Sequence, residues 1–171
     1  MSRLLKEYKK IQTTLSPNST HHNNNDDDEF NQIITYLHPI STSDLTHWQA
    51  QIKGPQGTPY ANHEFQLQIE CPPTYPIEPP IIHFQPLSMP HCNVNFQTGA
   101  ICLDILEKQH WTPAWNLMTT MKAIWILLKD PVPDSPLNVD IANILRVNDQ
   151  SAYNGLLNYY LSASPSPSTT K

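Results

Sequence analysis

The middle of the chain alternates hydrophobic and polar residues with the period of two that is typical of β-strands. Two segments show this pattern most clearly, and their apolar positions are Trp48, Ala50, Ile52, Phe65, Leu67 and Ile69. Strands of this kind bury one face and expose the other, so the pattern predicts an antiparallel sheet that is covered on one side. Residues 54–59, Gly-Pro-Gln-Gly-Thr-Pro, form the expected turn between these two strands.

Two shorter apolar segments complete a predicted meander of four strands. The first strand ends at His38-Pro39 and holds Ile33, Ile34, Tyr36 and Leu37. The last strand is expected at residues 81–84, after the proline-rich segment 75–80. Because proline fixes φ, the connection between the third and fourth strands is expected to be stiff.

The N-terminal segment has the period of a helix instead of a strand. Residues 2–15 place apolar side chains at helical spacing, at positions Leu4, Leu5, Tyr8, Ile11 and Leu15. Arg3, Lys6 and Lys10 gather on another face of this helix and form a basic stripe. The spacing alone leaves two interpretations of the stripe open, a solvated face or a docking surface.

The helical period returns after residue 116. Residues 117–128 form a broadly apolar helix, which is the natural cover for the buried face of the sheet. The proline-rich segment 130–136 ends this helix and forms a stiff loop. Asn138 is expected to cap the next helix, and a last helix begins at about Asp149.

The order of these elements predicts an α+β domain over residues 1–161. It consists of an N-terminal helix, a four-stranded antiparallel meander, an active-site loop and three C-terminal helices. Residues 16–29 are rich in Ser, Asn, His and Asp and are expected to be a disordered insert, because they have too little apolar area to offset the entropy of ordering. Residues 162–171 are expected to form a disordered Ser/Pro/Thr tail.

Composition and charge exclude several classes of function. The net charge of −5 argues against binding to nucleic acid, which needs a basic face. No apolar run approaches the roughly 20 residues of a membrane span, and the N-terminus lacks the apolar segment of a secretory signal. Three cysteines without C-x-x-C spacing predict neither a disulfide framework nor a metal site. The expected protein is therefore cytoplasmic, in a reducing compartment, and needs no cofactor.

The stretch from His91 to Trp115 contains the residues best suited to chemistry. A short polar loop, centred on Thr98-Gly99, leads to Cys102, nine residues after Asn93. The side chains of this stretch suit thiol chemistry better than packing alone. The other interpretation of Cys102 is a buried, inert cysteine.

Several motifs along the chain together resemble the ubiquitin-conjugating enzymes. The resemblance covers roughly residues 2–15 and 31–161. The motifs are Trp48 followed by Gly54-Pro55…Thr58-Pro59-Tyr60, Tyr75-Pro76-x-x-Pro79-Pro80, His91-x-Asn93, Gly99-x-Ile101-Cys102-Leu103-Asp104-Ile105-Leu106, Trp111-Thr112-Pro113 and Asp134-Ser135-Pro136-Leu137. Any one of them is weak evidence, but their joint order and spacing are specific.

One departure from the family pattern narrows the resemblance. The family usually has His-Pro-Asn where this chain has His91-Cys92-Asn93. With Val132, Trp115 and the segment 151–155, this replacement looks most like the peroxisomal members of the family in yeasts, the peroxin-4 type. Cys92 is interpreted as a redox-sensitive thiol or, preferably, as a small buried residue, and Cys71 as part of the core.

The resemblance implies roles for five residues at the site. Cys102 would carry ubiquitin as a thioester, and Asn93 would donate a hydrogen bond to the oxyanion that forms when a lysine attacks. The alternative for Asn93 is that it holds the loop through hydrogen bonds to the backbone. His91 is expected to brace the loop. Asp104 and Ser135 would lie beside the channel to the thiol, or would be ordinary surface residues.

The resemblance also implies partners. Ile77, Pro113 and Ala114 match the loops with which relatives contact RING-type ubiquitin ligases, and Arg3 and Lys6 match the docking surface for the ubiquitin-activating enzyme. This match favours the docking interpretation of the basic stripe. For a peroxisomal enzyme, a membrane-anchored peroxin would recruit the chain to the cytosolic face of the organelle, and the import receptor would be the substrate.

Three other functions compete with this interpretation. A non-catalytic ubiquitin-binding variant of the same fold is disfavoured, because Cys102 and Asn93 are both present. Conjugation of a related modifier stays open. A cysteine hydrolase that uses His91 and Cys102 is disfavoured, because no third-residue signature accompanies them and the cysteine does not begin a helix.

Overall fold

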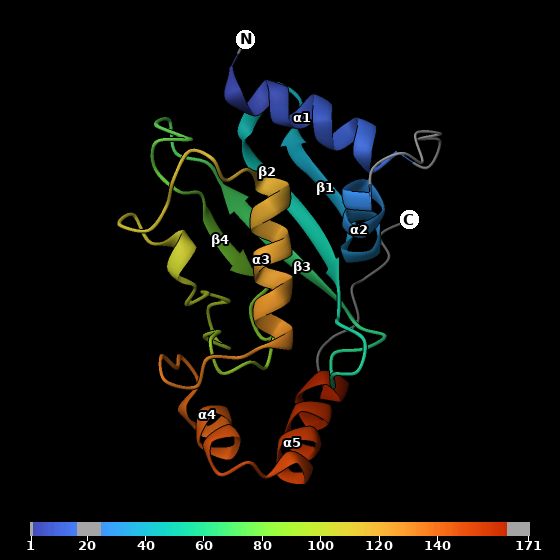
Figure 1. Ribbon diagram of the computed structural model, residues 1–171, viewed down its shortest axis with the longest axis vertical. Coiled ribbons are helices and arrows are strands. Elements are labelled where there is room, and N and C mark those ends of the chain that lie inside the picture. Colours follow the sequence, from blue (N-terminus) through green and yellow to red (C-terminus); the bar gives the residue numbers. More distant parts are fainter. Residues whose placement is uncertain (1, 17–24, 164–171) are drawn as a thin grey trace.

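The chain runs from N-terminal helices through a four-stranded sheet to three C-terminal helices (Figure 1). The structure is a computed structural model that describes residues 2–16 and 25–163. Its elements are α1 (Arg3–Thr14), α2 (Asn25–Ile33), β1 (Ile34–Ser41), β2 (Asp44–Lys53), β3 (Glu64–Glu70), β4 (Ile81–Phe84), the short 3₁₀ helix η1 (Asp104–Leu106), α3 (Leu117–Lys129), α4 (Val139–Arg146) and α5 (Gln150–Ala163).

The sheet is the predicted meander. Its order is β1-β2-β3-β4, and all neighbouring strands are antiparallel. Trp48, Ala50 and Ile52 of β2 are fully buried, whereas Gln49 and Lys53 between and after them are exposed. The period of two therefore identified the face of the sheet that lies in the core.

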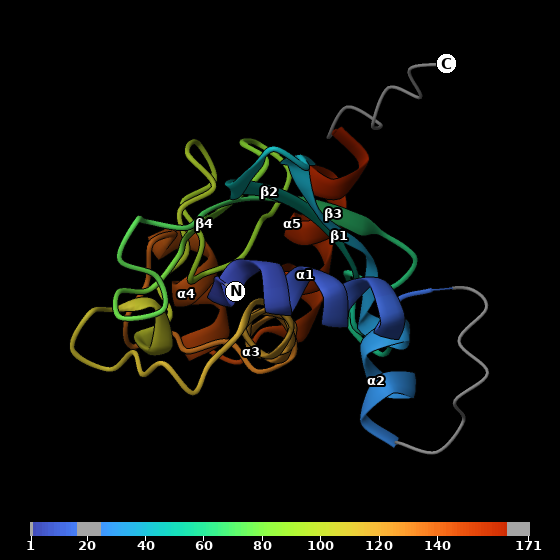
Figure 2. The ribbon, with the colours of Figure 1, turned by 90° about the horizontal axis from the view of Figure 1, so that it is seen from above.

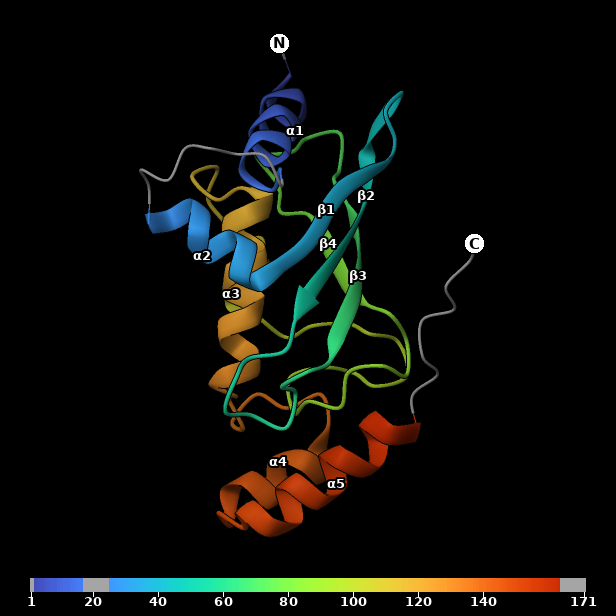
Figure 3. The same cartoon turned by 90° about the vertical axis from the view of Figure 1, so that its right-hand side faces the viewer.

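Helix α3 covers that face, as the breadth of its apolar side predicted. Figure 2 shows the strands curving over one side of α3, which is seen end on, and Figure 3 shows the same two layers from the side. Asn116 caps the first turn by accepting a hydrogen bond from the N–H of Thr119, at 3.1 Å. Leu117, Met121 and Ile124 of this helix are completely buried in the hydrophobic core that also holds the buried residues of the sheet.

Helices α4 and α5 lie together at the end of the molecule opposite α1 (Figure 1). The side chain of Asn138 accepts a hydrogen bond from Ile141 N at 3.2 Å, which confirms the predicted cap of α4. Tyr153, Leu157 and Leu161 form the buried side of α5. None of the helices in residues 2–16 and 25–163 is long and apolar enough to cross a membrane.

Helix α2 corrects the expectation of a disordered segment over residues 16–29. Residues 25–29 form the first half of this helix, and residues 17–24 lie outside the described part. The helix packs because Phe30 and Ile33, three positions apart, are buried, and because Glu29 pairs with Lys122 of α3 at 2.5 Å. The composition of the polar segment did not indicate that these contacts would hold its end in a helix.

Two boundaries also differ from the expectation. Ile33 ends α2 instead of opening the first strand, and β1 continues through Pro39 to Ser41. Proline fits there because β1 is an edge strand of the sheet. At the other end, α5 extends to Ala163, so the first two residues of the predicted tail are helical, and residues 164–171 lie outside the described part.

Candidate active site

The loop that leads to Cys102 is pressed against the end of β4. The N–H of Phe84 donates to the carbonyl oxygen of Gly99 at 2.9 Å, and Gly99 has a φ of +76°. A Cβ atom on Gly99 would lie 1.9 Å from the carbonyl oxygen of Phe84. Only glycine fits this approach, and it sets the direction in which the chain enters the following residues.

Asn93 holds the main chain of Cys102. The carbonyl oxygen of Asn93 accepts a hydrogen bond from the N–H of Cys102 at 2.8 Å. The thiol is partly exposed. Burial raises the pKa of Cys102, and the carboxylates of Glu107 and Asp104 raise it further. The site therefore contains a reachable thiol that is not strongly acidic.

The side chain of Asn93 fastens the segment 131–136 to the same loop. It is buried, and its Nδ2 donates to the carbonyl oxygens of Val132, at 2.7 Å, and Ser135, at 3.0 Å. Its Oδ1 accepts from the N–H of Val132 at 2.8 Å. Both N–H groups of the amide are thus engaged with backbone, as in the loop-holding interpretation of Asn93.

His91 braces the loop from beneath. Its ring is fully buried, its Nδ1 accepts from the N–H of Asn93 at 3.0 Å, and its Nε2 faces the carbonyl oxygen of Leu127 at 3.0 Å. The proton of the neutral ring therefore belongs on Nε2, which donates to Leu127. Burial lowers the pKa of His91 to about 4, so the ring is neutral at physiological pH.

Cys92 is buried between the two loops. Its carbonyl oxygen accepts from the N–H groups of Leu137 and Asn138, at 2.8 and 2.9 Å, and its Sγ donates to Oδ1 of Asn93 at 3.1 Å. Burial raises the pKa of Cys92 to about 11 and that of the buried Cys71 to about 12. Of the three cysteines, only Cys102 is partly exposed.

Asp104 and Ser135 lie in two segments that are both hydrogen-bonded to Asn93. Asp104 is exposed at the start of η1, two residues after Cys102. The side chain of Ser135 is exposed, and its carbonyl oxygen is bound by Asn93. Val132 is also exposed, at 48%. Asp104 is close enough to Cys102 for its carboxylate to raise the pKa of the thiol. The predicted position of both residues beside a channel stays a prediction.

The sequence as a whole matches a known family. The family model described as "Ubiquitin-conjugating enzyme" matches residues 3–160. The chain belongs to the ubiquitin-conjugating enzymes. It is 48% identical to the ubiquitin-conjugating enzyme E2-21 kDa of Saccharomyces cerevisiae, over 94% of this chain and 85% of that protein. It is 39% identical to protein PEROXIN-4 of Arabidopsis thaliana, over 93% of this chain and 90% of that protein.

Solved structures agree with the family assignment. The ubiquitin-conjugating enzyme Pex4p of H. polymorpha, solved in complex with the soluble domain of Pex22p, superposes with a TM-score of 0.83. The two chains are 38% identical, and the match covers 94% of each. Ubiquitin-conjugating enzymes are transferases whose general reaction passes through a cysteine thioester, and ubiquitin, an activating enzyme and a ligase are their partners.

The residues predicted to contact a ligase are exposed in this ubiquitin-conjugating enzyme. Ile77 is 76% exposed, and Pro113 and Ala114 are exposed in the segment before α3. The indole N–H of Trp111 donates to the carbonyl oxygen of Pro76 at 2.9 Å, so the two segments are joined directly. The structure therefore brings these three apolar residues onto two connected loops.

The predicted basic stripe on α1 divides into two kinds of residue. Lys6 is exposed. Arg3 instead lies in an internal network, since its Nε donates to Oε1 of Glu7 at 2.5 Å and its Nη2 to the carbonyl oxygen of Trp115 at 2.8 Å. Sequence reasoning missed Glu7. The spacing of four between Arg3 and Glu7 was the signal that pointed to their pairing.

Proposed function

We propose that Cys102 of this ubiquitin-conjugating enzyme accepts ubiquitin from the activating enzyme and passes it to an amine of a protein substrate. The observation that carries this proposal is the partial exposure of Cys102, while Cys71 and Cys92 are buried. A thiol must reach its partner's thioester, and only this one is accessible. Its main chain is also fixed, by the hydrogen bond to Asn93.

The proposed reaction has two steps. In the first, the thiolate of Cys102 attacks the carbonyl carbon of the thioester on the activating enzyme, whose own thiolate leaves. In the second, a lysine amine attacks the new thioester, the sulfur of Cys102 leaves as thiolate, and the amine gives up a proton to water or a nearby base. Exchange between sulfurs of similar basicity needs no strongly acidic thiol, which agrees with the raised pKa of Cys102.

Asn93 has two proposed roles in the second step. It first holds the loop 131–136 in place through Val132 and Ser135. To donate to the oxyanion as well, its Nδ2 would have to release one of its two carbonyl partners. The bond to Ser135, at 3.0 Å, is the longer of the two and is the one that we propose to open.

The residues around the thiol have supporting roles in this proposal. The carboxylate of Asp104 would attract the ammonium group of the incoming lysine. Ser135 would contribute its exposed hydroxyl to the wall of the channel. His91, neutral and bound to Leu127 and Asn93, would brace the loop instead of acting as a base.

We further propose that the enzyme acts at the peroxisome. The similar Arabidopsis protein is named PEROXIN-4, and the similar H. polymorpha enzyme was solved with the soluble domain of Pex22p. By analogy, a membrane-anchored peroxin would recruit this chain to the cytosolic face of the peroxisomal membrane. The substrate would be the import receptor, whose ubiquitination would support its recycling.

One experiment tests the covalent step. The protein is incubated with activating enzyme, ATP and ubiquitin and analysed on a gel with and without reductant. A reductant-sensitive adduct is expected for the wild type and for Cys71→Ala, and its loss is expected for Cys102→Ala. An adduct that persists in Cys102→Ala would contradict the proposal. A parallel reaction with a related modifier tests whether ubiquitin is the preferred cargo.

A second experiment tests the site of action. A strain that lacks its own peroxin-4 enzyme is given this chain or the Cys102→Ala variant, and import of a fluorescent peroxisomal matrix protein is observed. Import is expected with the wild-type chain alone. If the wild type forms the thioester but does not restore import, the peroxisomal role is wrong and the conjugating activity stands.

A further inference from the structure

Glu7 is a buried carboxylate that joins three separate segments of the chain. It lies on α1 and is only 8% exposed. Its Oε1 accepts from Nε of Arg3 at 2.5 Å and from the hydroxyl of Tyr75 at 2.9 Å, and its Oε2 accepts from the N–H of Leu117 at 2.9 Å. A buried carboxylate is tolerated only with such a set of donors, and here both of its oxygens are engaged.

Two of these donors stand directly beside the loops that are predicted to contact a ligase. Tyr75 lies two residues before Ile77, and Leu117 lies three residues after Ala114. Glu7 also orients Arg3, whose Nη2 donates to the carbonyl oxygen of Trp115 at 2.8 Å. A single carboxylate on α1 therefore holds both loops from the inner side.

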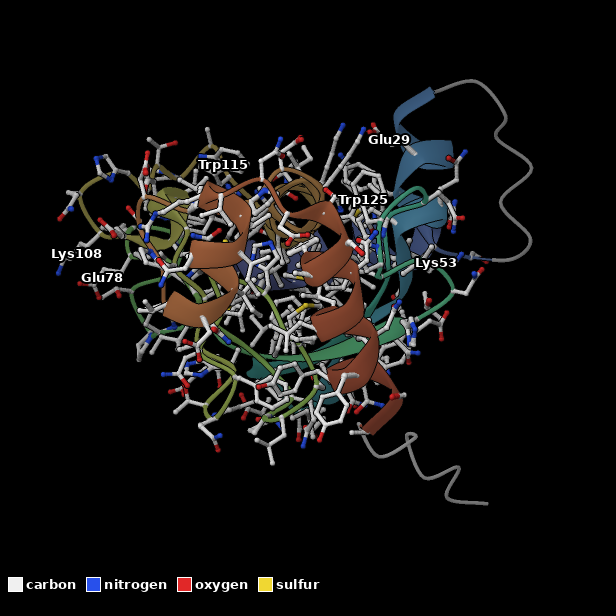
Figure 4. All side chains as sticks on the ribbon, turned by 90° about the horizontal axis from the view of Figure 1, so that it is seen from below. Glu29, Lys53, Glu78, Lys108, Trp115 and Trp125 are labelled. Carbon is white, nitrogen blue, oxygen red and sulfur yellow. The ribbon has the colours of Figure 1, made fainter. Side chains whose placement is uncertain are left out.

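Further contacts tie the two loops to each other without Glu7. The indole of Trp111 donates to the carbonyl oxygen of Pro76, and Lys108 pairs with Glu78 at the exposed edge. Figure 4 shows Lys108 and Glu78 together at the rim of the molecule, away from Trp115. These contacts limit how far the loops can separate, whereas the bonds of Glu7 fix where both of them stand relative to α1.

We propose that Glu7 is a positioning residue for ligase binding, which holds the Ile77 loop and the Pro113–Ala114 loop in the arrangement that a RING domain recognises. This inference rests on the conjugating function proposed above and on the contact with a ligase that the family resemblance predicts for these loops. A preformed surface binds more tightly than a mobile one, because the ordering entropy has been lost before the partner arrives. Glu7 touches no partner and acts through Arg3, Tyr75 and Leu117.

Glu7→Gln is the sharpest change, because it keeps the size of the side chain and removes only one acceptor oxygen. The remaining oxygen cannot serve Leu117 on one side and Arg3 and Tyr75 on the other. The amide N–H₂ group must then face either the N–H of Leu117 or the guanidinium of Arg3, and neither of these can accept. At least one of the three hydrogen bonds is therefore lost. Tyr75→Phe removes a single one of the three bonds and keeps the aromatic ring against Trp111.

The test measures the affinity of uncharged protein for a RING domain, selected because it binds the wild-type chain. Glu7→Gln is expected to raise Kd about tenfold, which corresponds to the loss of about one charge-assisted hydrogen bond. Tyr75→Phe is expected to raise it by a smaller factor. Glu29→Gln is the matched control, because Glu29 also joins two helices, through Lys122, but touches neither loop. Its Kd is expected to equal that of the wild type.

A purely structural role for Glu7 makes a different prediction. Glu7→Gln would then lower the melting temperature and leave Kd unchanged, or would change Kd no more than Glu29→Gln does, and either result would overturn the inference. Because the binding measurement uses uncharged protein, it is independent of the thioester. Failure of Cys102 to accept ubiquitin would therefore count against the proposed reaction only. The role of Glu7 would still be tested by the Kd of the uncharged variants for the RING domain.

Discussion

The carbonyl oxygen of Asn93 binds the N–H of Cys102 at 2.8 Å, while the side chain of the same asparagine binds Val132 and Ser135. One residue therefore holds both the backbone of Cys102 and the segment 131–136. Its neighbours support it, since His91 accepts from its N–H and Cys92 donates to its Oδ1. The predicted catalytic asparagine is thus also the central hydrogen-bonding residue of the site.

Asn93→Ala is expected to lower the free energy of unfolding by about 3 kcal/mol, because three partly buried hydrogen bonds to Val132 and Ser135 are lost. The variant should still accept ubiquitin on Cys102 and discharge it slowly to lysine. Urea unfolding and single-turnover discharge measure the two effects. Slow discharge without any loss of stability would mean that Asn93 serves the oxyanion alone. Full-rate discharge would remove the oxyanion role.

Gly99→Ala is expected to be severely destabilising, by more than about 4 kcal/mol, because the new Cβ would overlap the carbonyl oxygen of Phe84. Gly57→Ala is the matched control. Gly57 has nearly the same φ, +77°, but nothing lies within 4 Å of the position that a Cβ would take there, so only the conformational cost of about 1 kcal/mol remains. Equal losses of stability in the two variants would show that the contact with Phe84 relaxes freely.

The burial of His91 predicts that stability falls in mild acid. Its pKa in the folded chain is about 4, against 6.5 for the free side chain, so the unfolded chain binds the proton more readily. Stability is therefore fully present above pH 6.5 and decreases as the pH falls toward 4, by on the order of 3 kcal/mol in total. Urea unfolding between pH 7 and pH 4.5 measures this slope.

His91→Asn tests the origin of that acid sensitivity. Asparagine cannot take up a proton, so the variant should be less stable than the wild type at pH 7 and should lose less stability on acidification. An unchanged slope in the variant would assign the effect to other titrating groups.

The carboxylates beside Cys102 predict how its thiol responds to pH. Burial, Glu107 and Asp104 each raise its pKa. Glu107→Gln should therefore move the pH midpoint of alkylation by iodoacetamide downward and raise the rate at neutral pH. Glu70→Gln, which removes an equal charge from β3, is the control and should leave the midpoint in place. A midpoint that does not move in Glu107→Gln would contradict the electrostatic effect of Glu107.

Periodic burial explains why most of the fold was predictable. The alternation around Trp48 and the apolar breadth of α3 report directly which side of each element faces the core. Helix α2 was missed because its stability depends on contacts of Phe30 and Glu29 with other elements, which composition does not show. Local pattern predicts local structure, and packing between distant segments decides the exceptions.

The site divides in the same way. Family motifs drew attention to Cys102, Asn93 and His91, and the structure places them on one hydrogen-bonded loop. The donors that surround Glu7 escaped prediction, because Tyr75 and Leu117 lie 68 and 110 positions away from it. The residues next to Glu7 in the sequence do not indicate that Tyr75 and Leu117 are its hydrogen-bond partners. The chemical roles assigned to Cys102, Asn93, Asp104 and Ser135 stay predictions for the experiments above.

The bonds between Asn93 and Val132 span 39 residues and enclose the whole of α3. They join two segments that are far apart in the chain, so they depend on the packing of α3 that brings those segments together. A molecule in which α3 is displaced would keep Cys102 but lose the fixed segment that Asn93 fastens. Under the proposed mechanism, the rate of ubiquitin transfer would therefore itself report that the domain is intact.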